Sequence, residues 1–164
     1  MKGTVAFQPG LLMVAATLSA CAIPLTDYQR DAALQSVRMA TTAEPSDLLA
    51  RAEAGDATSQ HALSIVLRYG LNGERPDPEQ AAYWRRQAAA ARGTMPITQY
   101  TPAFGGAPSR VNILHVPRYA ITEPELAIAE ACAAALSEKR GDEVCGDAET
   151  AAELARNWAG AARR

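Results

Sequence analysis

The side chains able to do chemistry are few in this chain of 164 residues, which holds three cysteines and two histidines. One histidine, His115, has Arg118 and Tyr119 nearby, but the next carboxylate along the chain is Glu123, so no acid–base dyad is indicated. The sequence holds no glycine-rich phosphate loop, no nucleophile elbow and no spacing typical of a metal site. We therefore expect no enzymatic activity, no cofactor and no metal, and keep an enzyme only as a minor alternative.

The first cysteine, Cys21, ends a segment with the layout of an export signal. Lys2 supplies a positive charge, and residues 11–20 form an apolar run about half the length that spans a bilayer. The stretch Leu18-Ser19-Ala20-Cys21 resembles the lipobox of bacterial lipoproteins. The resemblance implies cleavage before Cys21, with lipid on its sulfur and on its new amino group. An ordinary secretory signal with a chance cysteine is the alternative.

The predicted anchor sets the expected location of the protein. Residues 1–20 would be a lipoprotein signal peptide, and residues 21–25 an anchor and tether. By resemblance to enterobacterial lipoproteins, Ala22 after the anchor favours the outer membrane over the inner one. We expect a periplasm-facing protein of the cell outer membrane, held there through its N-terminal lipid, since two or three acyl chains anchor a protein durably.

The other two cysteines, Cys132 and Cys145, form an even pair in an exported chain, which favours a disulfide. From Cys132 a helix would rise roughly 9 Å before it ends, and seven residues of returning loop reach ~23 Å, so closure is easy. Two separately buried cysteines are the alternative. A zinc site is disfavoured because no other Cys or His lies nearby in the sequence.

Residues 47–93 hold two helical patterns joined by a turn rich in glycine and proline. An apolar stripe at i, i+1, i+4 and i+5 predicts the first helix, and Gly70 is suited to end it. Asp77 as N-cap, Pro78 at the first helical position and Gln80 at the third predict the start of the second helix. Small alanines on both helices would allow close antiparallel packing around Trp84.

These residues resemble the Sel-one-like repeat, a relative of the tetratricopeptide repeat. Two departures exist: Ser64 replaces the usual glycine, and the loop between the helices is one residue longer. At His61 the family often has an aromatic residue, which implies a packing role. The matching positions are Gly55, Asp56, Ala57, Gln60, Leu63, Gly70, Asp77, Ala81, Trp84, Ala88 and Ala89.

Weaker copies of the pattern predict two more helix pairs, so the fold expected is all-α, a short solenoid of antiparallel pairs. Residues 26–164 would be one helical-repeat domain. Its parts are a degenerate pair (26–55), the best repeat (56–93), an insertion (94–122) and a degenerate, disulfide-linked pair (123–164). An unrelated helical bundle that contains one such repeat is the alternative.

The insertion, rich in proline and glycine, interrupts the helical pattern. Residues 97–100 and 111–116 are suited to the two short strands of a small β-hairpin. The insertion is too apolar for plain disorder, so we expect it to pack on the solenoid, across its concave face.

Charge is divided around the insertion. Residues 80–122 hold five arginines and no acidic residue, whereas residues 123–153 hold nine acids and two bases. The split predicts a positive and a negative surface, complementary within the fold or towards a partner, although solvated helix faces would look the same. The overall charge of −2 argues against nucleic acid as a partner.

The resemblance implies an adaptor or scaffold that binds an unidentified envelope protein. A module that binds an acidic glycan or peptidoglycan is the alternative, because arginines and aromatic side chains suit both tasks. The contact surface expected combines the insertion with the concave face: Arg85, Tyr100, Phe104, Arg110, His115 and Tyr119.

Overall fold

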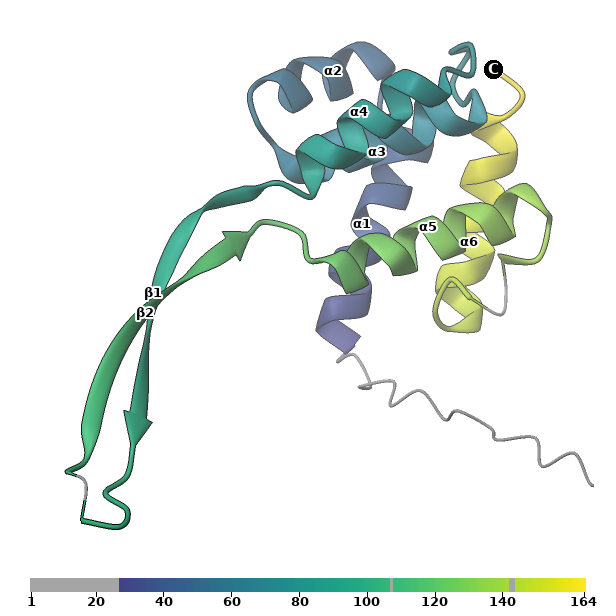
Figure 1. Ribbon diagram of the computed structural model, residues 1–164. Coiled ribbons are helices and arrows are strands. Elements are labelled where there is room, and N and C mark those ends of the chain that lie inside the picture. Colours follow the sequence, from purple (N-terminus) through teal and green to yellow (C-terminus); the bar gives the residue numbers. More distant parts are fainter. Residues whose placement is uncertain (1–26, 107, 142–143) are drawn as a thin grey trace, which may run out of the picture.

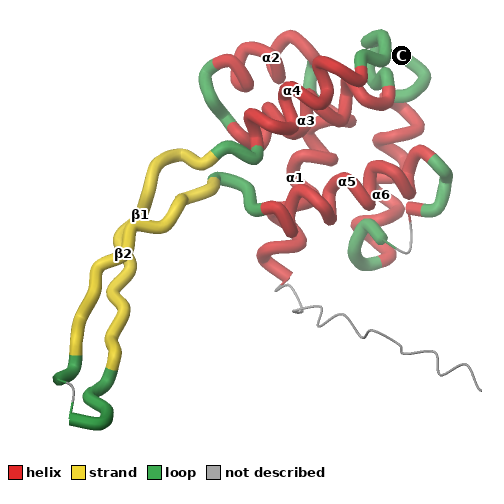
Figure 2. Tube along the Cα trace, in the orientation of Figure 1, coloured by secondary structure: helices red, strands yellow, loops and turns green. Residues whose placement is uncertain are grey.

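The computed structural model describes residues 27–106, 108–141 and 144–164, so the predicted signal peptide and Cys21 lie outside the described residues. Within these ranges six helices form a body, and a two-stranded antiparallel hairpin projects from it (Figure 1 and Figure 2). None of the described helices is both long and apolar enough to cross a bilayer. The elements in chain order are α1 (Asp27–Thr42), α2 (Pro45–Glu53), α3 (Ala57–Tyr69), α4 (Pro78–Ala88), β1 (Ala91–Thr101), β2 (Arg110–Tyr119), α5 (Glu123–Ser137) and α6 (Ala148–Ala161).

Local side-chain caps set the helix boundaries. Asp56 accepts a 3.0 Å hydrogen bond from the backbone N–H of Ser59 at the start of α3, and Gly70 ends this helix with a left-handed φ of 64°. Asp77 begins α4 by accepting hydrogen bonds of 3.1 and 3.0 Å from two backbone N–H groups in its first turn. The helix end predicted at Gly70 and the helix start predicted at Asp77 therefore lie where the sequence places them.

Helix α1 is the centre of the body, since it packs on α3, α5 and α6. It buries Leu34, Val37 and Ala40, each at most 1% exposed. A fully buried leucine or valine contributes about 1.5–3 kcal/mol, so this face of α1 is a main source of stability. On the other side, α3 packs against α2 and α4, and most of its residues are buried.

The all-α class expected from the sequence is wrong, because the chain is mixed α/β. The regular stack of helix pairs is also not what the packing shows: α1 has its main contacts with α3, α5 and α6. The insertion does not lie on the body. Its strands are longer than the sequence suggested, they are exposed along nearly their whole length, and they extend away from the helices (Figure 1).

The hairpin is in register from Thr94, paired with Pro117, to Thr101, paired with Arg110, with an irregularity between residues 91 and 94. Its strands are rich in threonine, valine, isoleucine and tyrosine, which favour extended backbone. The prolines that interrupt the helical pattern are compatible with these strands, because both are edge strands and a proline fits where no ladder N–H is needed.

The sulfur atoms of Cys132 and Cys145 lie 1.99 Å apart, as a disulfide with a Cα–Cα distance of 4.9 Å. Both residues are fully buried. The bond joins the middle of α5 to the segment that leads into α6. Helices α5 and α6 have few other contacts with each other. The bridge therefore holds the C-terminal helix in place against the body.

Removing this bridge should destabilise the protein by about 3 kcal/mol, because a closed loop of this size restricts the unfolded chain. The variant is Cys132→Ala with Cys145→Ala in a Cys21→Ser background, and the measurement is urea unfolding. Cys21→Ser alone is the control. A loss below about 1 kcal/mol would contradict the structural role given to the bridge.

Candidate functional site

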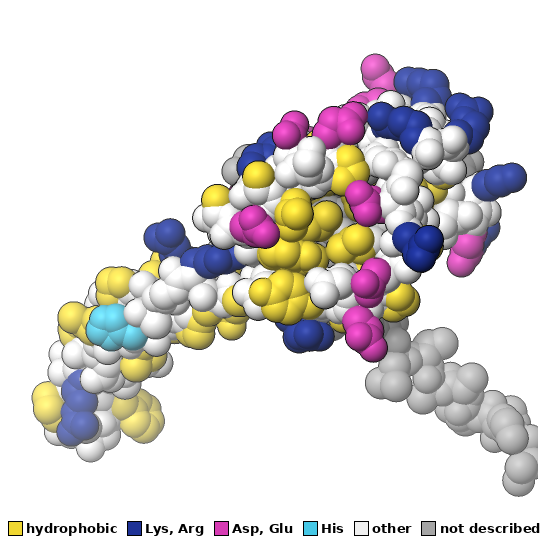
Figure 3. Space-filling view, turned by 90° about the horizontal axis from the view of Figure 1, so that it is seen from above, with side chains coloured by type: hydrophobic (Ala, Val, Ile, Leu, Met, Phe, Trp, Pro, Cys, Tyr) yellow, Lys and Arg dark blue, Asp and Glu magenta, His cyan; other side chains and the backbone are white. Residues whose placement is uncertain are grey.

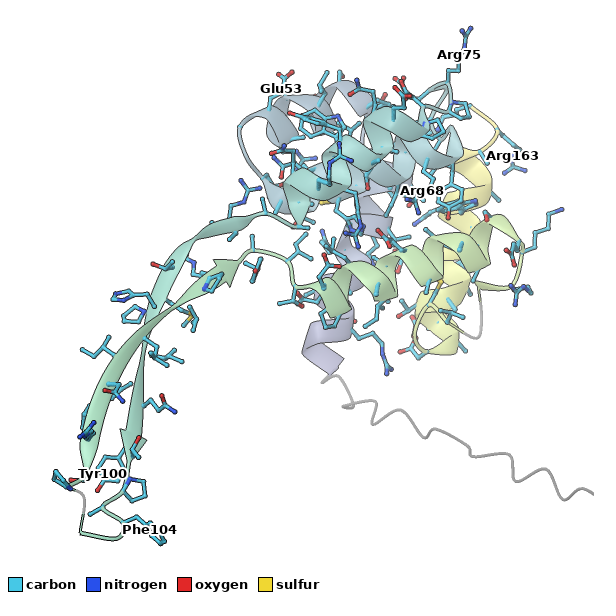
Figure 4. All side chains as sticks on the ribbon, in the orientation of Figure 1. Glu53, Arg68, Arg75, Tyr100, Phe104 and Arg163 are labelled. Carbon is cyan, nitrogen blue, oxygen red and sulfur yellow. A yellow bond between two sulfur atoms is a disulfide. The ribbon has the colours of Figure 1, made fainter. Side chains whose placement is uncertain are left out.

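We call the hairpin together with its connecting loop the arm. It comprises residues 91–106 and 108–119. Five of the six residues predicted to bind a partner lie on it: Tyr100, Phe104, Arg110, His115 and Tyr119. The sixth, Arg85, lies on α4 in the body. Tyr100 and Phe104 are at the far end of the arm, remote from the helices (Figure 4), and are 63% and 90% exposed. The predicted set is therefore divided between two places.

The register distributes the apolar residues of the arm over both faces, because successive side chains of a strand point to opposite sides. One face carries Met95, Ile97, Leu114 and Val116, all in the half of the arm nearer the body. The opposite face carries Tyr100, Val111 and Ile113 in the half nearer the tip. Most of these side chains are exposed, Ile113 at 65%. The arm thus presents two apolar patches, displaced along its length.

The arm is basic as well as apolar. Arg110 and Arg118 are both on β2, and the arm has no acidic residue. The space-filling view shows Lys or Arg side chains, a histidine and hydrophobic side chains along the arm, whereas Asp and Glu gather on the body (Figure 3). An apolar surface bordered by cations alone suits a binding partner that carries carboxylates.

Arg85 is bound within the protein rather than presented to solvent. Its Nε donates to Glu130 Oε1 at 2.8 Å, and its two terminal nitrogens donate to the Glu123 carboxylate at 2.9 and 3.2 Å. Both glutamates are on α5. Since β1 follows α4 and β2 precedes α5, this Arg85 cluster (Arg85, Glu123 and Glu130) joins the two helices from which the arm extends.

A second arginine ties the start of the arm to the body. Arg92 donates to the Gln60 side-chain oxygen at 2.6 Å and to the Gln87 carbonyl at 3.3 Å. The Gln60 amide in turn donates to the Ala52 carbonyl at 2.8 Å. The first residues of β1 are therefore attached directly to α3 and α4, and through Gln60 to α2.

Behind the Arg85 cluster lies a buried polar group that no motif in the sequence indicates. His61 Nε2 is 3.8 Å from Glu130 Oε1, and its Nδ1 is 2.9 Å from Ser36 Oγ. His61 is 1% and Ser36 2% exposed. Ser36, His61 and Glu130 come from α1, α3 and α5, so no local spacing in the sequence could have indicated the group.

A serine, a histidine and a carboxylate are the residue types of a hydrolytic triad, but their arrangement here differs from one. Ser36 Oγ donates to the Ala33 carbonyl at 3.1 Å, so its proton is directed at the backbone rather than at His61 Nδ1, which lies 2.9 Å away. A nucleophilic serine needs its proton directed at the histidine. Burial also separates Ser36 from any substrate. The group is structural, as the packing role predicted for His61 implies.

The environment of Glu130 stabilises its ionised form. The pKa of Glu130 is lowered from 4.5 to about 2, chiefly by His61 and then by Arg85, against the raising effect of burial. Hydrogen bonds from the same cluster, to Glu123 first and then to Glu130, raise the pKa of Arg85. The cluster is thus a charged contact at neutral pH.

An open groove of about 570 Å³ lies between α6 and the end of α5, and the sequence reasoning missed it. Its lining is mostly alanine side chains of α6, with Leu136, Trp158 and Lys139. The sequence signal for this groove is the set of alanines spaced by three and four beside the buried stripe of α6, a pattern that is also typical of close helix packing. No group of three potential metal ligands occurs in the part of the chain that the structure describes.

No protein-family model, no curated protein and no solved structure matches this chain. The resemblance to Sel-one-like repeats and to lipoprotein signals therefore stays a prediction.

The Arg85 cluster predicts an acid-sensitive contribution to stability. A carboxyl with a folded-state pKa of about 2 stabilises the protein above its unfolded-state pKa of 4.5, and this contribution is lost as pH falls from about 4.5 towards 2. Glu130→Gln should lower the free energy of unfolding at pH 7 by roughly 2 kcal/mol and flatten its decline below pH 5.

Urea unfolding at pH 7, 5, 4 and 3 measures this effect. Glu53→Gln, a change at an exposed position on α2, is the matched control and should follow the wild type. Equal acid sensitivity of the Glu130→Gln variant and the wild type would show that the ion pairs do not stabilise the fold.

Proposed function

We propose that this protein is a lipid-anchored adaptor of the bacterial envelope that binds another protein through its arm. The observation that supports this function best is the arm itself. Apolar side chains on both of its faces are exposed, and it extends away from the body (Figure 1). Contiguous exposed apolar surface with a polar border is typical of interaction sites. A two-stranded hairpin is at best marginally stable alone, so a partner that covers it gains affinity from apolar burial.

A second candidate function, glycan binding, is supported by the tip of the arm. Tyr100 and Phe104 are highly exposed there, and Arg110 begins β2 beside them. Aromatic faces stack on sugar rings, and an arginine fork binds carboxylates. This arrangement would occupy only the tip, whereas the apolar patches extend along the whole arm. Protein binding therefore explains more of the exposed surface.

Site-specific photo-crosslinking in intact envelopes tests the adaptor function. A crosslinking amino acid at Val111 or Ile97 should give one discrete protein adduct, because both positions lie on the exposed apolar patches. The same amino acid at Glu53, on the body, is the control and should give none. The adduct should resist muramidase and disappear in the variant Tyr100→Thr with Ile113→Thr, which keeps strand-compatible residues.

Two results would contradict the proposal. Equal adducts from Glu53 and from the arm would mean that the contact is not specific. Loss of the adduct after muramidase treatment would mean that glycan, not protein, occupies the arm.

The proposed membrane anchor has its own test. Cys21→Ser should move the protein from the membrane fraction to the soluble periplasmic fraction and abolish incorporation of labelled palmitate, because the acyl chains supply the membrane affinity. The Cys132→Ala with Cys145→Ala variant should keep the label. A Cys21→Ser protein that stays in the membrane fraction would contradict lipid anchoring.

A further inference from the structure

The two prolines within the strands fix which way the backbone of the arm points. Pro96 pairs with His115, and Thr94 pairs with Pro117. Proline has no N–H to give to a ladder, so both pairs are of the non-hydrogen-bonded kind. Residues of this kind alternate along each strand and direct their N–H and C=O groups outward. On β2 these residues are Val111, Ile113 and His115, and on β1 they are Thr98 and Tyr100.

Prolines limit the free edge of β1 more than that of β2. On β1 the outward positions 98 and 100 lie between Pro96 and Pro102, so only two outward N–H groups are consecutive. On β2 the three outward positions 111, 113 and 115 follow one another before Pro117 ends the series near the body. The longest continuous edge open to another strand is therefore that of β2.

The charges beside this edge indicate the chemistry of its occupant. Arg110 and Arg118 are both on β2 and, being eight residues apart, point to the same face. An extended chain covers about 26 Å over this interval. With no acid on the arm to neutralise them, the two guanidinium groups are suited to carboxylates near either end of an added strand.

We infer that the partner binds by β-strand addition to the free edge of β2, through an extended segment that carries acidic side chains opposite Arg110 and Arg118. The inference rests on the proposed function and specifies how the arm binds. Backbone hydrogen bonds from the outward groups supply affinity, and the side chains of Val111 and Ile113 supply apolar contact.

Charge disfavours a second copy of this chain as the occupant. Antiparallel pairing of two β2 edges about Ile113 would place Arg110 opposite Val116 of the second copy and diagonal to its Arg118. Because the pair would be two-fold symmetric, this Arg110–Arg118 contact would occur twice. Like charges at such positions destabilise a sheet. An acidic strand replaces both repulsions by attractions.

The test uses the purified chain with Cys21→Ser and a synthetic peptide of about eleven residues, alternating valine and threonine with glutamate near each end. Binding is measured by calorimetry. Ile113→Pro removes one outward N–H and leaves the hairpin ladder intact, whereas Ile113→Val keeps that N–H and is the matched control. A cross-strand NMR contact between Tyr100 and Val111 confirms that the arm is still paired in each variant.

The inference predicts that the acidic peptide binds, that Ile113→Pro weakens binding at least roughly tenfold, and that Ile113→Val changes it less than about twofold. A peptide with lysine in place of glutamate should not bind, and Arg110→Glu with Arg118→Glu should reverse this preference. Equal affinity of the proline and valine variants would overturn the inference, as would absence of binding by the acidic peptide.

Two further results separate the possible failures. A dimer seen by sedimentation that Ile113→Pro dissolves would assign the edge to a second copy and overturn the acidic partner. An envelope crosslink from the arm that persists in Ile113→Pro would leave the adaptor function in place and refute strand addition alone.

Discussion

The ion pairs of Arg85 with Glu130 and Glu123 are the constraint on which the placement of the arm depends. The chain leaves the body from α4 and returns into α5, but α4 packs mainly on α3, whereas α5 packs mainly on α1. Side-chain contacts must therefore join the two helices beneath the hairpin. The connection continues from Glu130 through His61 to Ser36 on the central helix, so the base of the arm is linked to the core.

The body and the arm differ in how far their apolar residues are buried. The body buries its apolar residues around α1 and is closed by the disulfide between Cys132 and Cys145. The arm has too few strands to bury its own apolar residues, and its two faces leave Ile97 and Ile113 exposed on opposite sides. Basic charge on such a surface disfavours association of two arms edge to edge.

Local features of the fold could be predicted from the sequence, and long-range ones could not. Asp56, Gly70 and Asp77 act within a few residues of themselves, so the helices they bound were predictable. Whether the hairpin would lie on the body or extend from it depends on surfaces formed by distant segments. The contact between Arg85 and Glu130, which are 45 residues apart, likewise depends on segments that are distant in the sequence. Arg85 was therefore expected to bind a partner, although it holds the fold together.

Amide hydrogen exchange across the arm, measured on the purified protein and on its complex with the crosslinked envelope partner, tests the central claim most directly. The outward amides of Val111, Ile113 and His115 should exchange fast in the free protein and become protected in the complex. Those of Asn112 and Leu114, within the ladder, should be protected in both. Fast exchange of the outward amides in the complex would show that the partner does not bind at this edge.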